Sequence, residues 1–73
     1  MSKADEMFKK LGYEKTENNT EIRYKEEKNA LEETFRFEIL FLKTLKVVGI
    51  DHLLDMQELQ AINEKVKELG WNE

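Results

Sequence analysis

The chain of 73 residues contains no cysteine, which excludes disulfide bonds, thiolate zinc sites and cysteine nucleophiles. It has one serine, Ser2, which we assign to a helix cap, and one histidine, His52. A serine-type or cysteine-type hydrolase needs a nucleophile beside a positioned base, so this enzyme class is excluded. The three glycines stand apart at positions 12, 49 and 70 and form no phosphate-binding loop. We therefore expect a protein that is not an enzyme and that has no catalytic, metal or cofactor site.

Long apolar runs and a strong charge of one sign are also missing. The longest apolar run covers residues 39–42, whereas a membrane helix needs about 20 residues, and the N-terminus lacks the apolar core of a secretory signal. The net charge is −4, with basic and acidic residues interspersed along the chain. These features predict a soluble protein of a reducing cytoplasm without a membrane partner, and they argue against nucleic-acid binding.

Two segments carry the pattern of amphipathic helices. Ser2, with Asp5 three residues later, suits an N-cap with a capping box, which predicts a helix over residues 3–11. Asp55, followed by Glu58, begins a second helix in the same way. The apolar residues of both segments recur at spacings of three and four: Ala4, Met7, Phe8 and Leu11 in the first, and Met56, Leu59, Ile62, Val66 and Leu69 in the second.

Both helical segments end in the same short motif, Leu-Gly-aromatic, within FKKLGYEK and VKELGWNE. With Leu11 and Leu69 as C-caps, the following glycines occupy the position where a left-handed backbone is easiest for a residue without Cβ. The aromatic residue then packs back on the helix, Tyr13 on Phe8 and Trp71 on Val66. The echo is therefore a stop signal used twice, in preference to an internal repeat or a recognition motif.

Between the helices the apolar period changes to two. Ile22 and Tyr24 alternate with basic residues, and the four positions Phe35, Phe37, Ile39 and Phe41 alternate with polar ones, which predicts two strands. Residues 45–50 predict a third strand. We place the loop after the first helix at Asn18-Asn19 and the strand connections at residues 28–32 and 42–44.

The predicted fold class is α+β: a helix, a three-stranded antiparallel β-meander and a helix, with both helices on one face of the sheet, in a single domain of residues 1–73. An all-α helical bundle is the alternative. It arises because KEEKNALEETFRFEILFLK is rich in helix formers, and because Leu31, Phe35, Ile39 and Leu42 also fit one helical stripe.

Three further groups of residues have a chemical and a structural interpretation. Asp51, His52 and Asp55 match no metal-ligand spacing, which favours a turn and an N-cap over a catalytic or metal site. The pairs Glu26-Glu27 and Glu32-Glu33 are typical of a solvated strand edge more than of an acid–base pair. The strand aromatics could stack on RNA bases, but in so small a chain they are needed for the core.

The alternation within the predicted strands leaves one candidate contact surface. If Phe35, Phe37, Ile39 and Phe41 point inward, the alternation sends Arg36, Glu38, Leu40 and Leu42 to the opposite face. The same alternation in the third strand places Leu45 and Val47 inward and Val48 outward. An apolar patch rimmed by charge marks an interaction surface. The predicted partner interface is Leu40, Leu42, Val48, Arg36 and Lys46, with Arg23 and Lys25 at its margin.

The opening ADEMFKKLGYEK, the pair Ile22 and Tyr24, and the close MQELQAINEKVKELGW resemble a group of small, mostly uncharacterised proteins encoded by phages and prophages of Gram-positive bacteria. The resemblance covers both ends, about half of the chain, and only loosely the middle. The segment FEILFLKTLKVVGID departs from it by being more apolar than the polar hairpin expected there. The resemblance implies a bacterial cytoplasmic setting, a host protein such as a defence component as partner, and no transferable catalytic residue.

Three functions from different classes follow. The first is a phage-encoded module that binds and occludes a host protein through the outer face of the sheet and an open strand edge. The second is a structural or assembly homo-oligomer that buries the same patch between identical subunits. The third is a binder of a small nucleotide or nucleic acid through Arg23, Lys25, Arg36 and Lys46, for which strong salt dependence is expected.

Overall fold

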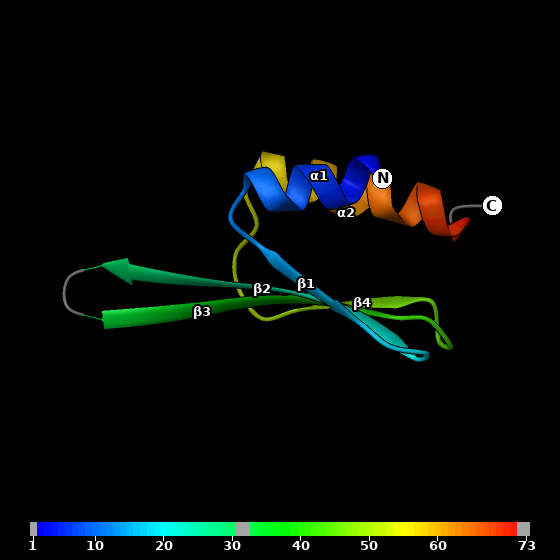
Figure 1. Ribbon diagram of the computed structural model, residues 1–73, viewed down its shortest axis with the longest axis horizontal. Coiled ribbons are helices and arrows are strands. Elements are labelled where there is room, and N and C mark those ends of the chain that lie inside the picture. Colours follow the sequence, from blue (N-terminus) through cyan, green and yellow to red (C-terminus); the bar gives the residue numbers. More distant parts are fainter. Residues whose placement is uncertain (1, 31–32, 72–73) are drawn as a thin grey trace. The chain divides into compact units, whose positions relative to one another are not determined.

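The computed structural model describes residues 2–30 and 33–71, and their side chains except those of 28–30 and 33–35. Two helices and four strands follow one another along the chain (Figure 1). They form an α+β structure, as predicted. The elements are α1 (Lys3–Lys10), β1 (Glu14–Glu17), β2 (Glu21–Ala30), β3 (Glu33–Leu42), β4 (Val47–Ile50) and α2 (Met56–Leu69).

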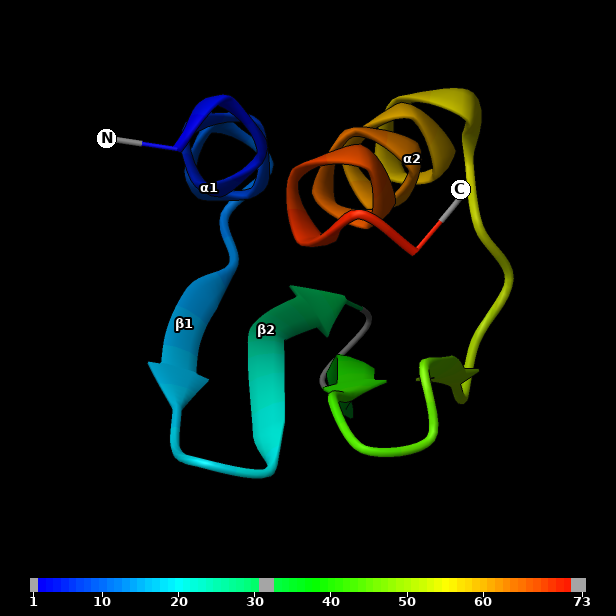
Figure 2. The same cartoon turned by 90° about the vertical axis from the view of Figure 1, so that its right-hand side faces the viewer.

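The chain divides into two compact units. A helical unit combines Met1–Tyr13 with Leu54–Glu73, and a sheet unit consists of Glu14–Leu53. The helical unit is discontinuous, because α1 and α2 come from opposite ends of the described chain and pack side by side (Figure 2). The predictions of a single domain and of both helices on one sheet face stay predictions.

Both helices begin at their predicted N-caps, and the complete capping box is seen at α2. The Ser2 side chain accepts a hydrogen bond of 3.0 Å from the Asp5 backbone N–H at the start of α1. Asp55 and Glu58 form a complete capping box at the start of α2. Each cap satisfies N–H groups that have no partner within the helix, and a cap of this kind contributes roughly 1 kcal/mol.

The two helices end with the same geometry. The C-cap of α1 is Leu11, as predicted, whereas that of α2 is Gly70, one residue after the predicted Leu69. Gly12 has a φ of 96° and Gly70 a φ of 73°, both in the left-handed region. The Tyr13 N–H donates to the Phe8 carbonyl over 3.0 Å, and the Trp71 N–H donates to the Val66 carbonyl over 3.1 Å. These bonds are the six-to-one closure of a Schellman ending.

The helical unit has a small apolar core. Phe8 is fully buried, and its ring meets Tyr13 edge-on with the ring centres 5.7 Å apart. Complete burial of a phenylalanine side chain contributes roughly 1.5–3 kcal/mol. The other buried apolar residues of this unit are Ala4, Ala61 and Ile62.

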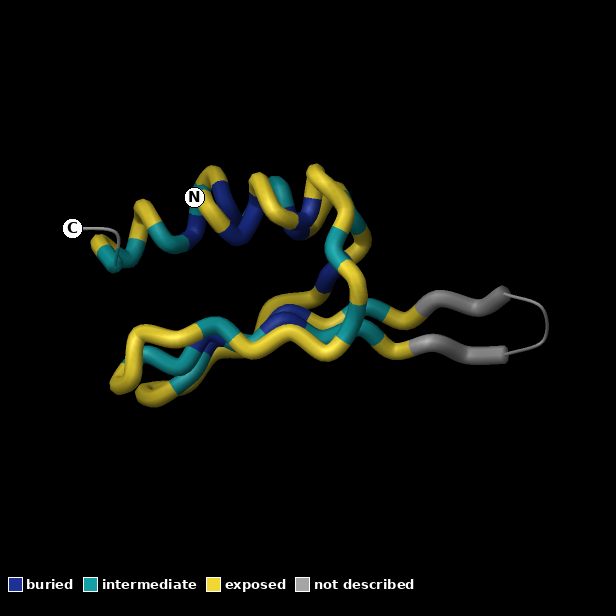
Figure 3. Tube along the Cα trace, turned by 180° about the vertical axis from the view of Figure 1, so that it is seen from behind, coloured by how far each residue is buried: buried dark blue, intermediate teal, exposed yellow. Residues whose placement is uncertain are grey.

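The four strands form one antiparallel sheet in the order β1-β2-β3-β4. The core of this sheet lies in the middle of the two long strands, where Ile22 pairs with Phe41 and Tyr24 pairs with Ile39. All four residues are almost completely buried, and the Tyr24 and Phe41 rings meet edge-on at 5.7 Å. Figure 3 shows the buried positions of the sheet in the middle of the strands and exposed positions at the turns.

The structure corrects four points of the predicted fold. The all-α alternative is wrong, because residues 21–30 and 33–42 are strands. The sheet has four strands, since β1 was missed and Asn18 and Asn19 lie in the turn after it. The second connection is a turn over residues 43–46, so Leu45 and Lys46 precede the strand predicted to contain them. The first connection is shorter than residues 28–32, since the long strands reach residues 30 and 33.

Candidate functional site

The register of the sheet assigns each side chain to one of two faces. Residues directly opposite one another in an antiparallel pair have side chains on the same face. Phe41 pairs with Ile22 and Val48, so these three residues share the face that carries the buried core. The opposite face carries a row in which Arg23 pairs with Thr16 and Leu40, and Leu40 pairs with Gly49. We call this second face the Arg23 face.

Charges on the Arg23 face are largely paired with one another. The Arg23 guanidinium lies between two carboxylates, with Nη2 at 2.9 Å from Glu21 Oε2 and Nε at 3.0 Å from Glu38 Oε1. The hydrogen bond to Glu21 raises the pKa of Arg23 above its ordinary value. Farther along, Arg36 Nε lies 3.3 Å from Glu27 Oε1, and both side chains are mostly exposed. Both arginines therefore already have a carboxylate partner.

An apolar strip of three side chains borders this ion network. Leu42 of β3 pairs with Val47 of β4. Leu40 lies two residues before Leu42 in β3, on the same face of the sheet. Both leucines are partly exposed, and Val47 is 45% exposed. We call Leu40, Leu42 and Val47 the apolar strip.

Gly49 opens a hollow beside the apolar strip. It lies opposite Leu40, and a Cβ added to it would stand 3.9 Å from the Leu40 Cβ, which is ordinary contact distance. Because glycine has no side chain, Leu40 has no side-chain partner on the β4 side of its row. An open hollow of about 310 Å³ lies here, lined by Glu38, Leu40, Gly49, Ile50 and Asp51.

The predicted interface residues are placed partly as expected. The register puts Leu40, Leu42 and Arg36 on the Arg23 face, as the alternation indicated. Val48 was predicted on that face, but it pairs with Phe41 and lies on the core face, where it is partly buried. Val47 was predicted to point inward, but it pairs with Leu42 and lies on the Arg23 face. Lys46 is an exposed turn residue with a φ of 55°, not a strand residue.

The error on β4 has one physical cause. The turn between β3 and β4 has four residues, 43–46, and Lys46 closes it in a left-handed conformation with its N–H bonded to the Leu42 carbonyl. Counting the turn as one residue shorter reverses the face of each residue in the following strand. The pairing of the aromatic Phe41 with Val48 was the signal for the correct register. The predicted inward placement of Phe35 concerns a side chain outside those described.

Asp51 and His52 follow β4 directly and form the dyad noted in the sequence. Asp51 Oδ1 lies 3.0 Å from His52 Nδ1 and accepts a hydrogen bond of 3.2 Å from the Glu38 backbone N–H. The hydrogen bond to His52 and then that from Glu38 hold the pKa of Asp51 below its ordinary value. The His52 ring stacks on Phe37, with ring centres 4.5 Å apart. Asp51 thus provides a hydrogen-bond acceptor for β3 just beyond the end of β4, which is a structural role.

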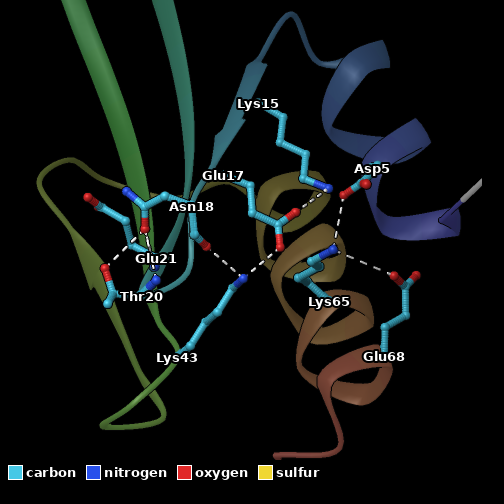
Figure 4. Close-up of polar contacts among 9 residues, drawn as sticks. All are labelled: Asp5, Lys15, Glu17, Asn18, Thr20, Glu21, Lys43, Lys65 and Glu68. Atoms are coloured by element: carbon cyan, nitrogen blue, oxygen red, sulfur yellow. Dashed lines mark hydrogen bonds and ion pairs between the residues drawn. The ribbon is translucent and has the colours of Figure 1, made fainter.

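A second polar cluster fixes the other end of the sheet (Figure 4). The Asn18 side chain accepts hydrogen bonds from the backbone N–H groups of Thr20 and Glu21, both over 2.9 Å. The Lys43 ammonium reaches across from the next turn to Glu17 at 2.7 Å and to the Asn18 carbonyl at 2.8 Å. The Lys43 hydrogen bond, followed by that from Lys15, lowers the pKa of Glu17. These contacts join the β1–β2 and β3–β4 turns.

The buried Lys65 and the polar groups around it hold the two helices of the helical unit together. Lys65 Nζ lies 3.2 Å from Asp5 Oδ1 and 3.8 Å from Glu68 Oε1 (Figure 4). Glu68 in turn accepts hydrogen bonds from the Ser2 hydroxyl and, over 2.8 Å, from the Ala4 N–H. Burial acts to raise the pKa of Glu68, but these hydrogen bonds and the Lys65 charge outweigh it and lower the pKa.

Glu58 is a buried carboxylate with a structural explanation. It accepts a hydrogen bond from the Tyr13 hydroxyl and another, over 3.2 Å, from the Asp55 N–H. The first bond fixes the segment after α1 on α2, and the second is half of the capping box. Both contacts are structural.

Among residues 2–30 and 33–71, no group of three or more histidine, aspartate or glutamate side chains could hold a metal ion. Neither of the described helices is long and apolar enough to cross a membrane. Comparison with protein-family models, with curated proteins and with solved structures finds no match.

Proposed function

We propose that the protein is a small non-enzymatic interaction module that binds and occludes another protein through the Arg23 face. The observation that carries the proposal is the apolar strip, in which Val47 is 45% exposed beside the partly exposed Leu40 and Leu42. Contiguous apolar side chains rimmed by charge are typical of protein contact surfaces. The paired charges around the strip restrict which proteins fit, because an unmatched charge opposite them is costly.

The resemblance noted in the sequence supports a bacterial host protein as the partner. We place the module in the cytoplasm of a bacterial host, encoded by a phage or prophage, with a host protein such as a defence component as its target. The segment FEILFLKTLKVVGID, which supplies the apolar strip of this face, departs from that resemblance by being more apolar than the polar hairpin expected there. A contact surface particular to this chain accounts for that difference.

Binding of a nucleotide or nucleic acid has weaker support from the geometry. Two of the four cations proposed for it, Arg23 and Arg36, each pair with a carboxylate of the same face. A phosphate must displace those carboxylates before it gains the charge-assisted bonds that it needs. Protein contact requires no such exchange.

Capture experiments with paired variants test the proposal. Tagged protein is purified gently from a Gram-positive lysate and weighed by native mass spectrometry, alongside a Leu40→Thr/Leu42→Lys variant. The matched control is Leu53→Thr/Met56→Lys, since these residues are 96% and 67% exposed and neither belongs to the Arg23 face. We expect wild type and control to retain one stoichiometric protein and the face variant to lose at least about tenfold in retention, or roughly 1.4 kcal/mol.

Two results would count against the proposal. A face variant that keeps its circular dichroism spectrum and retains the partner as well as wild type would remove the Arg23 face from the contact. Binding that falls steeply with salt and releases a nucleotide on denaturation would favour the phosphate-binding alternative.

A further inference from the structure

β4 is the last strand of the sheet and pairs, among the described residues, with β3 alone. Its pairing runs without interruption from Val47 to Ile50, so no bulge turns this edge away. Val47, Gly49 and Ile50 are exposed, Val47 by 45% and Ile50 by 41%. A flat, uncharged and exposed strand edge is a template for a further strand.

The direction of one hydrogen bond shows which backbone groups of β4 point outward. The Glu38 N–H points away from β2, because it donates to Asp51. Backbone groups alternate in direction along an antiparallel strand, so those of Leu40 and Leu42 point the same way, toward Gly49 and Val47. It follows that Val48 and Ile50 direct their N–H and C=O groups to the open edge.

The two ends of β4 carry opposite charges. Lys46 precedes the strand and Asp51 follows it, and between them no residue is charged. When two identical strands pair antiparallel, the Lys46 end of one lies beside the Asp51 end of the other, and a two-fold axis makes this contact twice. Parallel pairing would instead bring like charges together. The edge is therefore complementary to a second copy of itself.

We propose that two copies of the chain pair through β4 around a two-fold axis at Gly49, which joins their sheets edge to edge. In this register Val48 of one copy lies opposite Ile50 of the other, and each pair exchanges both of its N–H···O=C bonds. An axis at Val48 would instead need the Lys46 N–H, which already donates to the Leu42 carbonyl over 2.9 Å. At the Gly49 axis the two opposed residues are glycines, so no side chains can clash across the axis.

This contact is independent of the proposed function. It uses the edge of the sheet, whereas the proposed partner covers the apolar strip on one face. The contact also puts the two copies of the hollow beside Leu40 on one continuous surface.

A single introduced cysteine tests the register, because the chain has none of its own. Opposed residues at the axis are about 4.5–5.5 Å apart at Cα, which suits a disulfide. We expect Gly49→Cys to form an intermolecular disulfide at least about tenfold faster than the matched variant Val47→Cys. Val47 is exposed and lies on the same face, but the two copies of this residue stand roughly 13 Å apart along the strands.

Sedimentation equilibrium of wild type and Gly49→Lys tests the contact itself. We expect wild type to dimerise and Gly49→Lys to be a monomer with an unchanged circular dichroism spectrum, because two lysines would face each other at the axis while a Cβ fits within one copy. The Leu40→Thr/Leu42→Lys variant should dimerise like wild type.

Several outcomes would overturn the proposal. A wild-type monomer at several hundred micromolar, or equal crosslinking of Val47→Cys, would do so. Dimers lost in the Leu40→Thr/Leu42→Lys variant but kept in Gly49→Lys would move the contact to the Arg23 face. A wild-type monomer whose captured protein is lost on Gly49→Lys but kept by the Leu40→Thr/Leu42→Lys variant would assign the edge to that protein instead.

Discussion

The two edge strands of the sheet have the same length and opposite chemistry. β1 has the sequence EKTE, and its four residues are all exposed, whereas β4 has the sequence VVGI. On β1, Glu17 is tied to Lys15 over 3.2 Å and to Lys43 over 2.7 Å. Charges on an edge strand prevent another strand from pairing with it. One edge of the sheet is thus protected and the other is left available for pairing.

The largest loss of stability is expected at Phe41, in the core between the two edge strands. Phe41 is fully buried and pairs with Ile22 on β2 and with Val48 on β4. Phe41→Ala should cost about 3–5 kcal/mol of the free energy of unfolding. Urea titration followed by circular dichroism measures it. The control is Leu42→Ala on the other face, where the residue is partly exposed and no more than about 1–2 kcal/mol is expected. Equal losses would mean that the core face does not support the sheet.

Removing the charges of β1 should abolish the difference between the edges. The variant Glu14→Thr/Lys15→Thr/Glu17→Thr has two uncharged edges, so its sheets can pair on both sides and assemble without a fixed limit. We expect dimers to give way to large assemblies in light scattering and sedimentation velocity. Adding Gly49→Lys to the same variant should return it to small oligomers, and assemblies that persist there would show that β4 takes no part.

Loss of stability alone should leave the edges unchanged. Gly70 has a φ of 73° with nothing within 4 Å of an added Cβ, so Gly70→Ala introduces backbone strain without a clash. We expect a loss of about 1 kcal/mol, or roughly 4–8 °C in Tm for a domain of this size. The dimer should persist below that Tm. An unchanged Tm would contradict the assigned helix ending.

The smallest expected effect is a pH dependence of stability at the two edges. The pKa of Glu17 at β1 and that of Asp51 after β4 are both lowered in the folded chain. Each carboxylate therefore contributes stability that is present above its unfolded-state pKa and is lost as pH falls through its folded-state pKa. Both side chains are largely exposed, so we expect about 0.5 kcal/mol or less for each.

Glu17→Gln and Asp51→Asn should each flatten the fall in unfolding free energy between neutral and strongly acidic pH. Urea titrations at several pH values measure this slope. Only Glu17→Gln should also reduce the effect of salt at neutral pH, because Glu17 alone of the two pairs with lysines. A steeper slope in either variant would show that the carboxylate destabilises the fold.

The sequence predicted the helices better than the sheet, because their signals are local. The caps Ser2 and Asp55 and the glycines after Leu11 and Leu69 act within a few residues of chain, and all four helix ends lie where these residues indicate. β1 has no apolar residue and hence no alternation to read. It is a strand because β2 pairs with it.

The candidate site was found in part for the same reason. Alternation within β3 correctly put Leu40 and Leu42 opposite to Phe41, since the period of two holds within one strand. The face of β4 depends on the length of a turn, and that length depends on the conformation of one residue, Lys46. A site assembled from two strands therefore carries the register error of the turn between them.

The contact between Glu68 and the first residues of α1 sets the order in which the protein can fold during its synthesis. A ribosome completes α1 long before α2 exists, and a helix of eight residues is too short to be stable in water alone. The sheet unit, by contrast, is continuous in the chain and can pair as soon as it emerges. α1 is therefore synthesised first but becomes stable late, because Lys65 and Glu68, which hold it, must first leave the ribosome.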